Sequence, residues 1–346
     1  MRRIYVQGVG AVSPAGWGVA ALVDAVSNQR GTPVQSLVRQ GVPDGLPVRL
    51  VATPESFSPG LSHPRMRRSS PISHYAVGAA IEALGRDWER NKSTGERLGV
   101  ICCAFAGCVS YSRRFFDEVL RDPSTASPLI FPETVFNAPA SHLSAVLGTT
   151  ERNYTLVGDQ AEFLKGLALG AGWICDGTMD GCLVVAAEEA DWLTADALRL
   201  LSPGLIASEG AGAVYLNQEP SAVELTGVTQ PNLYLQRRGQ AKALLGWEWP
   251  TTPDQNADLL CDGLSEATLS NSPESKIWRD WTGPRMSPKR FLGEGLSAGS
   301  AWQVVAAVNA LRLGVAKRAF ISVVGLNEQA IGAVFSKTVL PGDTGD

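Results

Sequence analysis

Histidine is the rarest of the chemically versatile residues in this sequence. The 346 residues include three histidines, and the last of them is His142. Zinc sites built from cysteine and histidine pairs are therefore not expected, and no role in the second half can fall to a histidine. Charge is also sparse, because Lys, Arg, Asp and Glu make up 18% of the chain and the formal net charge is −4. Without a basic stretch that could neutralise many phosphates, nucleic-acid binding is not expected.

Long apolar runs are missing as well. No run approaches the ~18 residues of a membrane-spanning helix, so no membrane partner is expected. Residues 1–16 contain glutamine, glycine and proline in place of the continuous apolar stretch of a signal peptide. The cysteines show no metal-binding spacing and no neighbouring base, which predicts buried, reduced thiols in a cytoplasmic protein. They are Cys102, Cys103, Cys108, Cys175, Cys182 and Cys261.

Apolar residues are plentiful by comparison. They make up 45% of the chain, while its 18% of charged residues lies below the ~25% of an average soluble domain. A chain with so few charges is expected to bury more than its own core, which predicts a substantial oligomer interface.

Strand and helix patterns alternate along the chain. Short apolar runs predict strands, and apolar residues at a spacing of three and four predict helices. Residues 255–269 are predicted to form a helix among surface connections. The other predicted strands are 3–12, 98–105, 154–157, 211–216 and 222–228, and the other helices are 18–27, 73–84, 111–121 and 136–147.

One unit occurs twice. A helix rich in alanine and glycine ends at a glycine suited to the left-handed conformation, and a four-residue link leads to an apolar strand. The repetition predicts a duplicated α/β architecture with mostly parallel strands covered by helices, divided into residues 1–217 and 218–346. The two units are 160–175, Gly177 and 182–189, then 297–313, Gly314 and 319–325.

Five segments, in order along nearly the whole chain, resemble the β-ketoacyl synthases of the thiolase superfamily. The resemblance implies an α/β, thiolase-like fold with two α-β-α-β-α layered halves. The segments are GVGAVSPAGWG at 8–18, RMRRSSPISHYAVGAAIEAL at 65–84, FNAPASHLSAVLG at 136–148, SEGAGAVYL at 208–216 and LGEGLSAGSA at 292–301.

The residues that carry condensation in that family are replaced. The family holds the acyl chain on a cysteine thiolate and uses two histidines for decarboxylation and oxyanion stabilisation. The resemblance places Gln160 at the cysteine position, Asp280 at the first histidine position and Glu294 at the second, while the family's lysine is retained as Lys289. The condensing machinery is therefore predicted to be lost, and no metal or cofactor is expected. Asp280 and Glu294 as an acid–base or metal couple are less favoured than a structural Glu294, paired with Lys289 or with its loop backbone.

The glutamine itself suggests a subfamily. Gly158-Asp159-Gln160 resembles the Gly-x-Gln pattern of chain-length factors, the inactive partners of ketosynthases in type II polyketide systems. An amide could fill the cysteine's space and accept hydrogen bonds from helix N–H groups. The resemblance implies a heterodimer with an active ketosynthase, formed through residues 111–157, in which this subunit shapes the pocket for a growing polyketide or polyene chain.

The same resemblance suggests which side chains face the pocket or its carrier protein. An acyl carrier protein is expected to contact mainly the partner subunit, and an arginine cluster is either a further contact or a solvated helix start. The wall candidates are Phe105, Tyr111, Phe115, Phe116 and Phe136, and the cluster is Arg65, Arg67 and Arg68.

Two alternatives stay open at this point. Ketosynthase-like domains with glutamine at the cysteine position also act as malonyl-carrier decarboxylases, but those keep both histidines and this chain keeps neither. Loss of one preorganised oxyanion donor typically costs ~3 kcal/mol of transition-state stabilisation. The other alternative is a non-catalytic homodimer with the thiolase fold.

Overall fold

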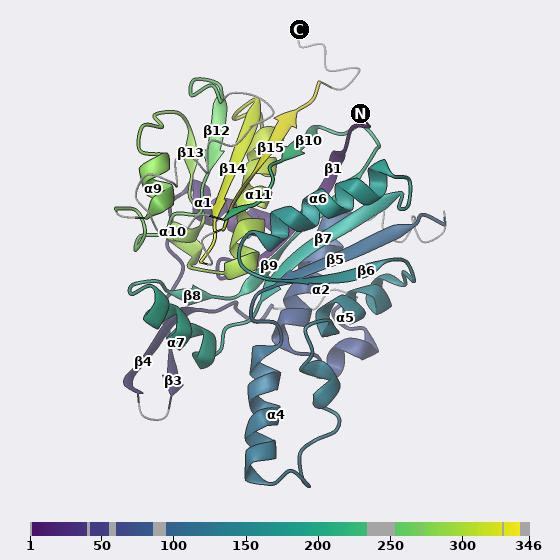
Figure 1. The fold of residues 1–346 in the computed structure, drawn as a ribbon, viewed down its shortest axis with the longest axis vertical. Coiled ribbons are helices and arrows are strands. Elements are labelled where there is room, and N and C mark those ends of the chain that lie inside the picture. The colour runs from purple at the N-terminus through teal and green to yellow at the C-terminus, as the bar shows by residue number, and fades with distance from the viewer. Residues whose placement is uncertain are drawn as a thin grey trace.

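Ten strands follow one another in a continuous mixed sheet to which both halves of the sequence contribute (Figure 1). The computed structural model describes residues 2–39, 42–54, 60–85, 95–233, 253–270, 272–326 and 329–339. In order across the sheet, the strands are β13 (Arg285–Met286), β12 (Asp258–Cys261), β14 (Arg318–Val324), β15 (Gln329–Lys337), β10 (Val223–Val228), β1 (Tyr5–Ser13), β9 (Gly210–Asn217), β7 (Gly181–Glu188), β5 (Leu98–Ala104) and β6 (Asn153–Val157). Two short strands lie off this path, β2 (Gly16–Trp17) beside β1 and β11 (Asn232–Leu233) beside β15.

The strand order is mirrored about the contact between β1 and β10. Outward from that contact, β1-β9-β7-β5-β6 on one side answers β10-β15-β14-β12-β13 on the other. The two outermost pairings of each side are parallel, and all the others are antiparallel. The expectation of mostly parallel strands was therefore wrong, because β9 and β15 turn back after β7 and β14. Since β10 pairs with β1, the sheet is continuous across residue 217, and the two-domain division stays a prediction.

The two helices of the predicted repeat lie at the centre of the fold, in contact with strands of both halves. Helix α6 (Glu162–Cys175) precedes β7, and helix α11 (Leu296–Arg312) precedes β14. Helix α11 packs on β7 and β9 of one side and on β12 and β14 of the other, and α6 likewise contacts both sides. Small residues permit this closeness, since a Cβ on Gly212 would lie 2.6 Å from that of Ala301. Gly177 and Gly314, with φ of 72° and 74°, end the two units in the predicted left-handed conformation.

The other helices cover the outer faces and edges. Helices α2 (Pro71–Leu84) and α5 (Ala138–Leu147) cover the outer face of the first half, and α1 (Val19–Ser27) lies against β1 and α11. The 3₁₀ helix η1 (Pro64–Arg68) leads into α2, while α9 (Pro273–Ile277) and α10 (Lys289–Leu292) belong to the second half. Among the described residues, no helix has the length and apolar character needed to span a membrane.

The sequence patterns missed a small second sheet and misassigned one strand. Strands β3 (Gln35–Arg39), β4 (Val42–Arg49) and β8 (Ala207–Ser208) form the second sheet, which packs under α7 (Trp192–Leu201). The helix predicted at 255–269 is wrong, because that segment contains the buried strand β12 followed by turns. Four buried residues are too few to show a period of two.

One hairpin of the first half stands away from the sheet. Helix α4 (Val109–Arg121) projects outward, and the chain returns through the 3₁₀ helix η3 (Phe131–Glu133) (Figure 1). Residues 105–137 are called the arm below. No residue of α4 is fully buried, so the arm contributes little to the core.

Candidate functional site

Gln160 lies in the turn between β6 and α6, with 1% of its surface exposed. Its amide Nε2 donates to Glu294 Oε1 at 3.4 Å, and its Oε1 accepts the Leu326 N–H at 3.1 Å. Ser300 Oγ donates to its main-chain carbonyl at 2.7 Å. Both ends of the side chain are thus in use, and they connect the first-half turn to two segments of the second half. The expectation that this amide accepts from helix N–H groups was wrong, because its acceptor oxygen points to the loop after β14.

Lys289 and Glu294 form the ion pair that the sequence suggested. Lys289 Nζ lies 3.0 Å from Glu294 Oε2, and both side chains are buried. Glu294 Oε1 also accepts the Leu296 N–H at 2.9 Å. Leu296 has φ of 49°, in the left-handed region that a leucine rarely adopts, so the carboxylate holds a strained first residue of α11.

A second buried carboxylate, Glu274 of α9, lies near Lys289. Gln160, Lys289, Glu294 and Glu274 are called the cluster below. Glu274 accepts the Gly263 N–H at 3.0 Å and the Ser322 hydroxyl at 2.7 Å. A Cβ on Gly263 would lie 3.2 Å from Glu274 Oε2 and 3.7 Å from Lys289 Nζ, which places the ammonium and this carboxylate on either side of one small space. Burial, followed by the charge of Asp262, raises the pKa of Glu274 to about 8, and the Lys289 charge opposes that rise.

Asp280 does not belong to the cluster. It lies exposed in the turn after α9, whereas the contacts of Glu294 are Lys289, Gln160 and backbone. Asp280 therefore lies outside the cluster, its assignment to the family's first histidine position stays a prediction, and the second acidic side chain near Lys289 is Glu274. The position of Asp280, two residues before a Thr-Gly pair, is a weak sequence signal for a site residue. Glu274 had a clearer local signal of a helix start, because it follows Ser272-Pro273.

The side chains described above include neither a cysteine nor a histidine. An amide does not attack a thioester, and each polar atom described above already has a partner. Burial raises the pKa of Cys102 to about 12 and that of Cys103 well above its usual value, so both thiols are inert, as predicted. His142 is likewise engaged elsewhere, since its Nε2 lies 2.7 Å from Glu133. In the part of the chain that the structure describes, no three Cys, His, Asp or Glu residues are grouped to hold a metal ion.

The five wall candidates do not lie together. Phe105 is half-buried against an apolar cluster that includes Leu296 and borders Leu326, the residue whose N–H bonds to Gln160. Phe105 is the first residue of the arm, and the other four lie further along it. There the Phe115 and Phe131 rings are 5.4 Å apart, Phe136 packs over Gly107, Tyr111 is half-buried, and Phe116 is 59% exposed. Of the five, Phe105 is the one that packs against the apolar cluster containing Leu296.

The three arginines of η1 point away from the core. Arg65, Arg67 and Arg68 are exposed, and the buried side chain of this short helix is Met66. A contact with an acidic carrier protein stays a prediction.

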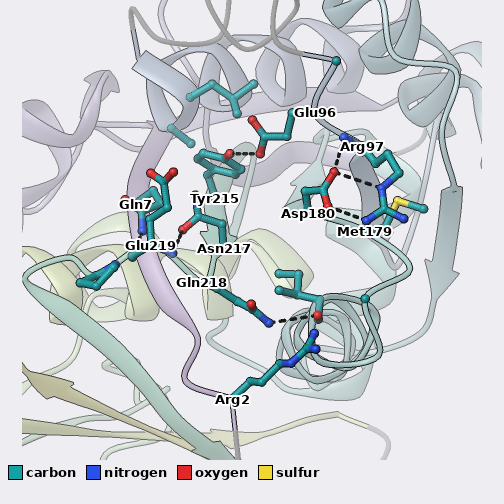
Figure 2. A pocket seen from close by; sticks show the side chains of 16 residues that line it. Arg2, Gln7, Glu96, Arg97, Met179, Asp180, Tyr215, Asn217, Gln218 and Glu219 are labelled. Carbon is teal, nitrogen blue, oxygen red and sulfur yellow. Dashed lines mark hydrogen bonds and ion pairs between the residues drawn. The ribbon is translucent and has the colours of Figure 1, made fainter.

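A separate cavity of about 1050 Å³ lies where β1 starts and β9 ends (Figure 2). Three of its charged side chains have partners within the lining. Arg97 forms a bidentate ion pair with Asp180, with N–O distances of 3.0 and 2.5 Å. The Tyr215 hydroxyl donates a hydrogen bond to Glu96. None of the predicted site residues lines it.

The largest exposed apolar side chains gather on the arm and on β6. Strand β6 ends the sheet path, so its outer edge has no neighbour among the described strands. The sequence analysis placed the partner contact in residues 111–157, which contain all of these side chains, and named two of them, Phe116 and Phe136, as wall candidates. The set is Phe116, Leu120, Leu129, Phe131, Val135, Phe136, Tyr154 and Val157.

Comparison with known proteins identifies the fold of the chain. No protein-family model matches the sequence, and no curated protein matches it. Among solved structures, the ishigamide ketosynthase/chain length factor has a TM-score of 0.76 at 17% identity, covering 97% of this chain and 100% of that one. A β-ketoacyl synthase from Burkholderia phymatum has a TM-score of 0.79 at 15% identity, covering 98% and 100%. A ketosynthase in complex with its chain length factor from Xenorhabdus doucetiae gives 0.77 at 14%, covering 97% and 98%. The chain therefore has the thiolase-like fold of ketosynthases over nearly its whole length.

Proposed function

We propose that this chain is a non-catalytic subunit of the chain-length-factor type, which pairs with an active β-ketoacyl synthase and forms part of the wall around the growing acyl chain. The observation that carries the proposal is Gln160. The resemblance puts it at the position of the family's cysteine, its amide nitrogen and oxygen each have a hydrogen-bond partner, and it lies beside a buried ion pair. Two of the similar structures contain chain length factors, which supports this choice.

The exposed apolar face supports a protein partner. Eight large apolar side chains of the arm and β6 are exposed, and apolar surface exposed in this way is typical of protein interaction sites. An open sheet edge beside the arm gives a partner strand a place to pair. We infer that the arm and the β6 edge together receive the ketosynthase, which would supply the cysteine, both histidines and most carrier-protein contacts, with Arg65, Arg67 and Arg68 as a further carrier contact.

The wall function follows from packing. A pocket closes to a further two-carbon unit when its walls are packed as densely as a protein interior, because each overlapping methylene then displaces several side chains. Phe105 is the wall candidate that packs against the apolar cluster containing Leu296, and the phenylalanines further along the arm would reach the partner's side.

The first test is co-expression with a ketosynthase encoded beside this gene, followed by size-exclusion chromatography with mass detection. We expect a one-to-one complex. The double variant Phe116→Asp/Leu120→Asp is expected to abolish it, because two carboxylates would have to be desolvated in an apolar interface. Leu200→Asp on α7 is the matched control, since Leu120 and Leu200 are both 68% exposed. A homodimer that ignores the ketosynthase would contradict the proposal and favour the decarboxylase or the homodimeric alternative.

A second test asks whether restoring the cysteine alone would make the site catalytically active. Gln160→Cys is expected to give no condensation and no measurable malonyl-carrier decarboxylation, because the chain has no histidine after His142 and because Glu294, the base bonded to residue 160, is already paired with Lys289. Iodoacetamide labelling of residue 160, measured by mass spectrometry at pH 7, should be slow for the same reason. Decarboxylation by the unchanged protein, measured as release of carbon dioxide from malonyl carrier protein, would contradict a non-catalytic role.

A further inference from the structure

The arm is attached to the molecule by acidic side chains at the end of β7. Glu188, the last residue of β7, accepts the N–H groups of Phe105 and Ala106 at 2.6 and 3.0 Å. Glu189 accepts the Ser110 N–H in the first turn of α4 at 2.7 Å. These three N–H groups belong to the base of the arm, where the chain leaves β5 and begins α4.

A third carboxylate holds the arm from the side. Asp191 accepts Arg113 Nε at 2.9 Å and also caps α7 through the Leu193 N–H at 3.1 Å. It is buried, as are Glu188 and Glu189, so water competes little for these contacts. Residues 188–191 therefore bond to three successive parts of the arm, at residues 105–106, 110 and 113.

The same residues bind the arm to the body. Glu189 also accepts the Ser70 hydroxyl at 2.5 Å and the Ile72 N–H at 3.1 Å, at the start of α2. One carboxylate thus joins the first turns of α2 and α4. Since α4 has no fully buried residue, its own packing does little to set its direction, and these contacts at its base have to do so.

We propose that Glu188, Glu189 and Asp191 are positioning residues, an acidic clamp that holds the arm at a fixed angle so that its apolar face meets the partner already ordered. The inference rests on the proposed function for the identity of the partner. A segment held in its bound orientation loses less conformational freedom on association, which strengthens binding without any new contact. The clamp predicts that residues outside the interface control the affinity.

The test uses Arg113→Met in the full chain, because this variant releases the arm from Asp191 and leaves the α7 cap in place. Hydrogen exchange followed by mass spectrometry should show faster exchange in residues 109–121 and unchanged exchange in α6 and β7. Affinity for the ketosynthase should fall by about tenfold, seen as faster dissociation in surface plasmon resonance. The matched control is Arg114→Met, which removes an ion pair with Glu118 within the same helix.

A second variant keeps the outcome clear. Glu189→Gln should accelerate exchange at the starts of both α4 and α2, since this carboxylate serves both. Unchanged exchange in residues 109–121 in both variants would overturn the clamp. If exchange in residues 109–121 accelerates in the variants but no ketosynthase binds the unchanged protein, the clamp stands and the proposed partner is refuted. The failure of the clamp and the failure of the proposed function can therefore be told apart.

Discussion

Replacing Lys289 by methionine is expected to lower the free energy of unfolding by about 3–5 kcal/mol, the usual cost of removing one partner of a buried ion pair. The ammonium is the cation that faces both Glu294 and Glu274 in the cluster. Without it, Glu294 would be left buried with an uncompensated charge. Its hold on the strained Leu296 would weaken as well, so the start of α11 should loosen with it.

Chemical denaturation at pH 7 measures this loss, and Lys165→Met provides the comparison. Lys165 also pairs with a glutamate one turn away, Glu162, at 2.7 Å, but it is partly exposed. Its removal should cost below ~1 kcal/mol. If Lys289→Met proves too unstable to purify, the double variant Lys289→Met/Glu294→Gln should recover most of the stability, because it removes the orphaned charge. A loss from Lys289→Met no larger than that from Lys165→Met would contradict the structure of the cluster.

Stability is expected to fall as the pH rises from about 5 to 8. Burial raises the pKa of Glu188 from its usual 4.5 to about 7 and that of Glu274 to about 8. Burial also raises the pKa of Glu189 and Glu209. A raised pKa in the folded state means that folding retains a proton which the unfolded chain releases. The stabilisation is therefore complete below about pH 4.5 and is lost as the pH passes through the folded values.

The size of this effect is large for one residue. A shift of the Glu188 pKa from 4.5 to about 7 corresponds to roughly 3 kcal/mol across that range. Guanidinium unfolding at pH 5, 6, 7 and 8 should show the decline. Glu274→Gln should make the decline shallower, because the amide cannot ionise and can still bond to the Ser322 hydroxyl. A free energy of unfolding that rises over this range would contradict the prediction.

Glu118→Gln is the control for that series. A hydrogen bond from the Ser127 N–H lowers the pKa of Glu118, so it is ionised in both states throughout the measured range. Its substitution should leave the slope between pH 5 and 8 unchanged.

The cluster and the clamp share a design. In both, buried carboxylates bond to backbone N–H groups or to one cation, and they connect segments that are far apart in the sequence. Gln160 reaches Glu294 and Leu326, while Glu189 connects Ser70 to Ser110. A catalytic site keeps some of its polar groups unpaired for a substrate, whereas these groups are paired with one another. That pairing is the physical reason why we propose a shaping role for this chain rather than a chemical one.

Much of the architecture was present in the sequence. The repeat around Gly177 and Gly314 is local, because a helix, its glycine stop and the next strand are read from neighbouring residues, and both units were found close to their predicted bounds. The absence of histidine after His142 also follows from the chain alone, since no arrangement in space can supply a residue that the second half lacks, whereas the assignment of Gln160 to the family's cysteine position stays a prediction.

Tertiary structure decided what depends on distant contacts. Strand directions were mispredicted because pairing is set between segments, and strand β12 was missed because its four residues are identified only by burial between neighbours. Glu274 was overlooked, and Asp280 lies outside the cluster, because which carboxylate faces Lys289 is decided by the turn after α9. The arm's exposure and its acidic clamp likewise follow from the packing of β7 against β5, which no local pattern encodes.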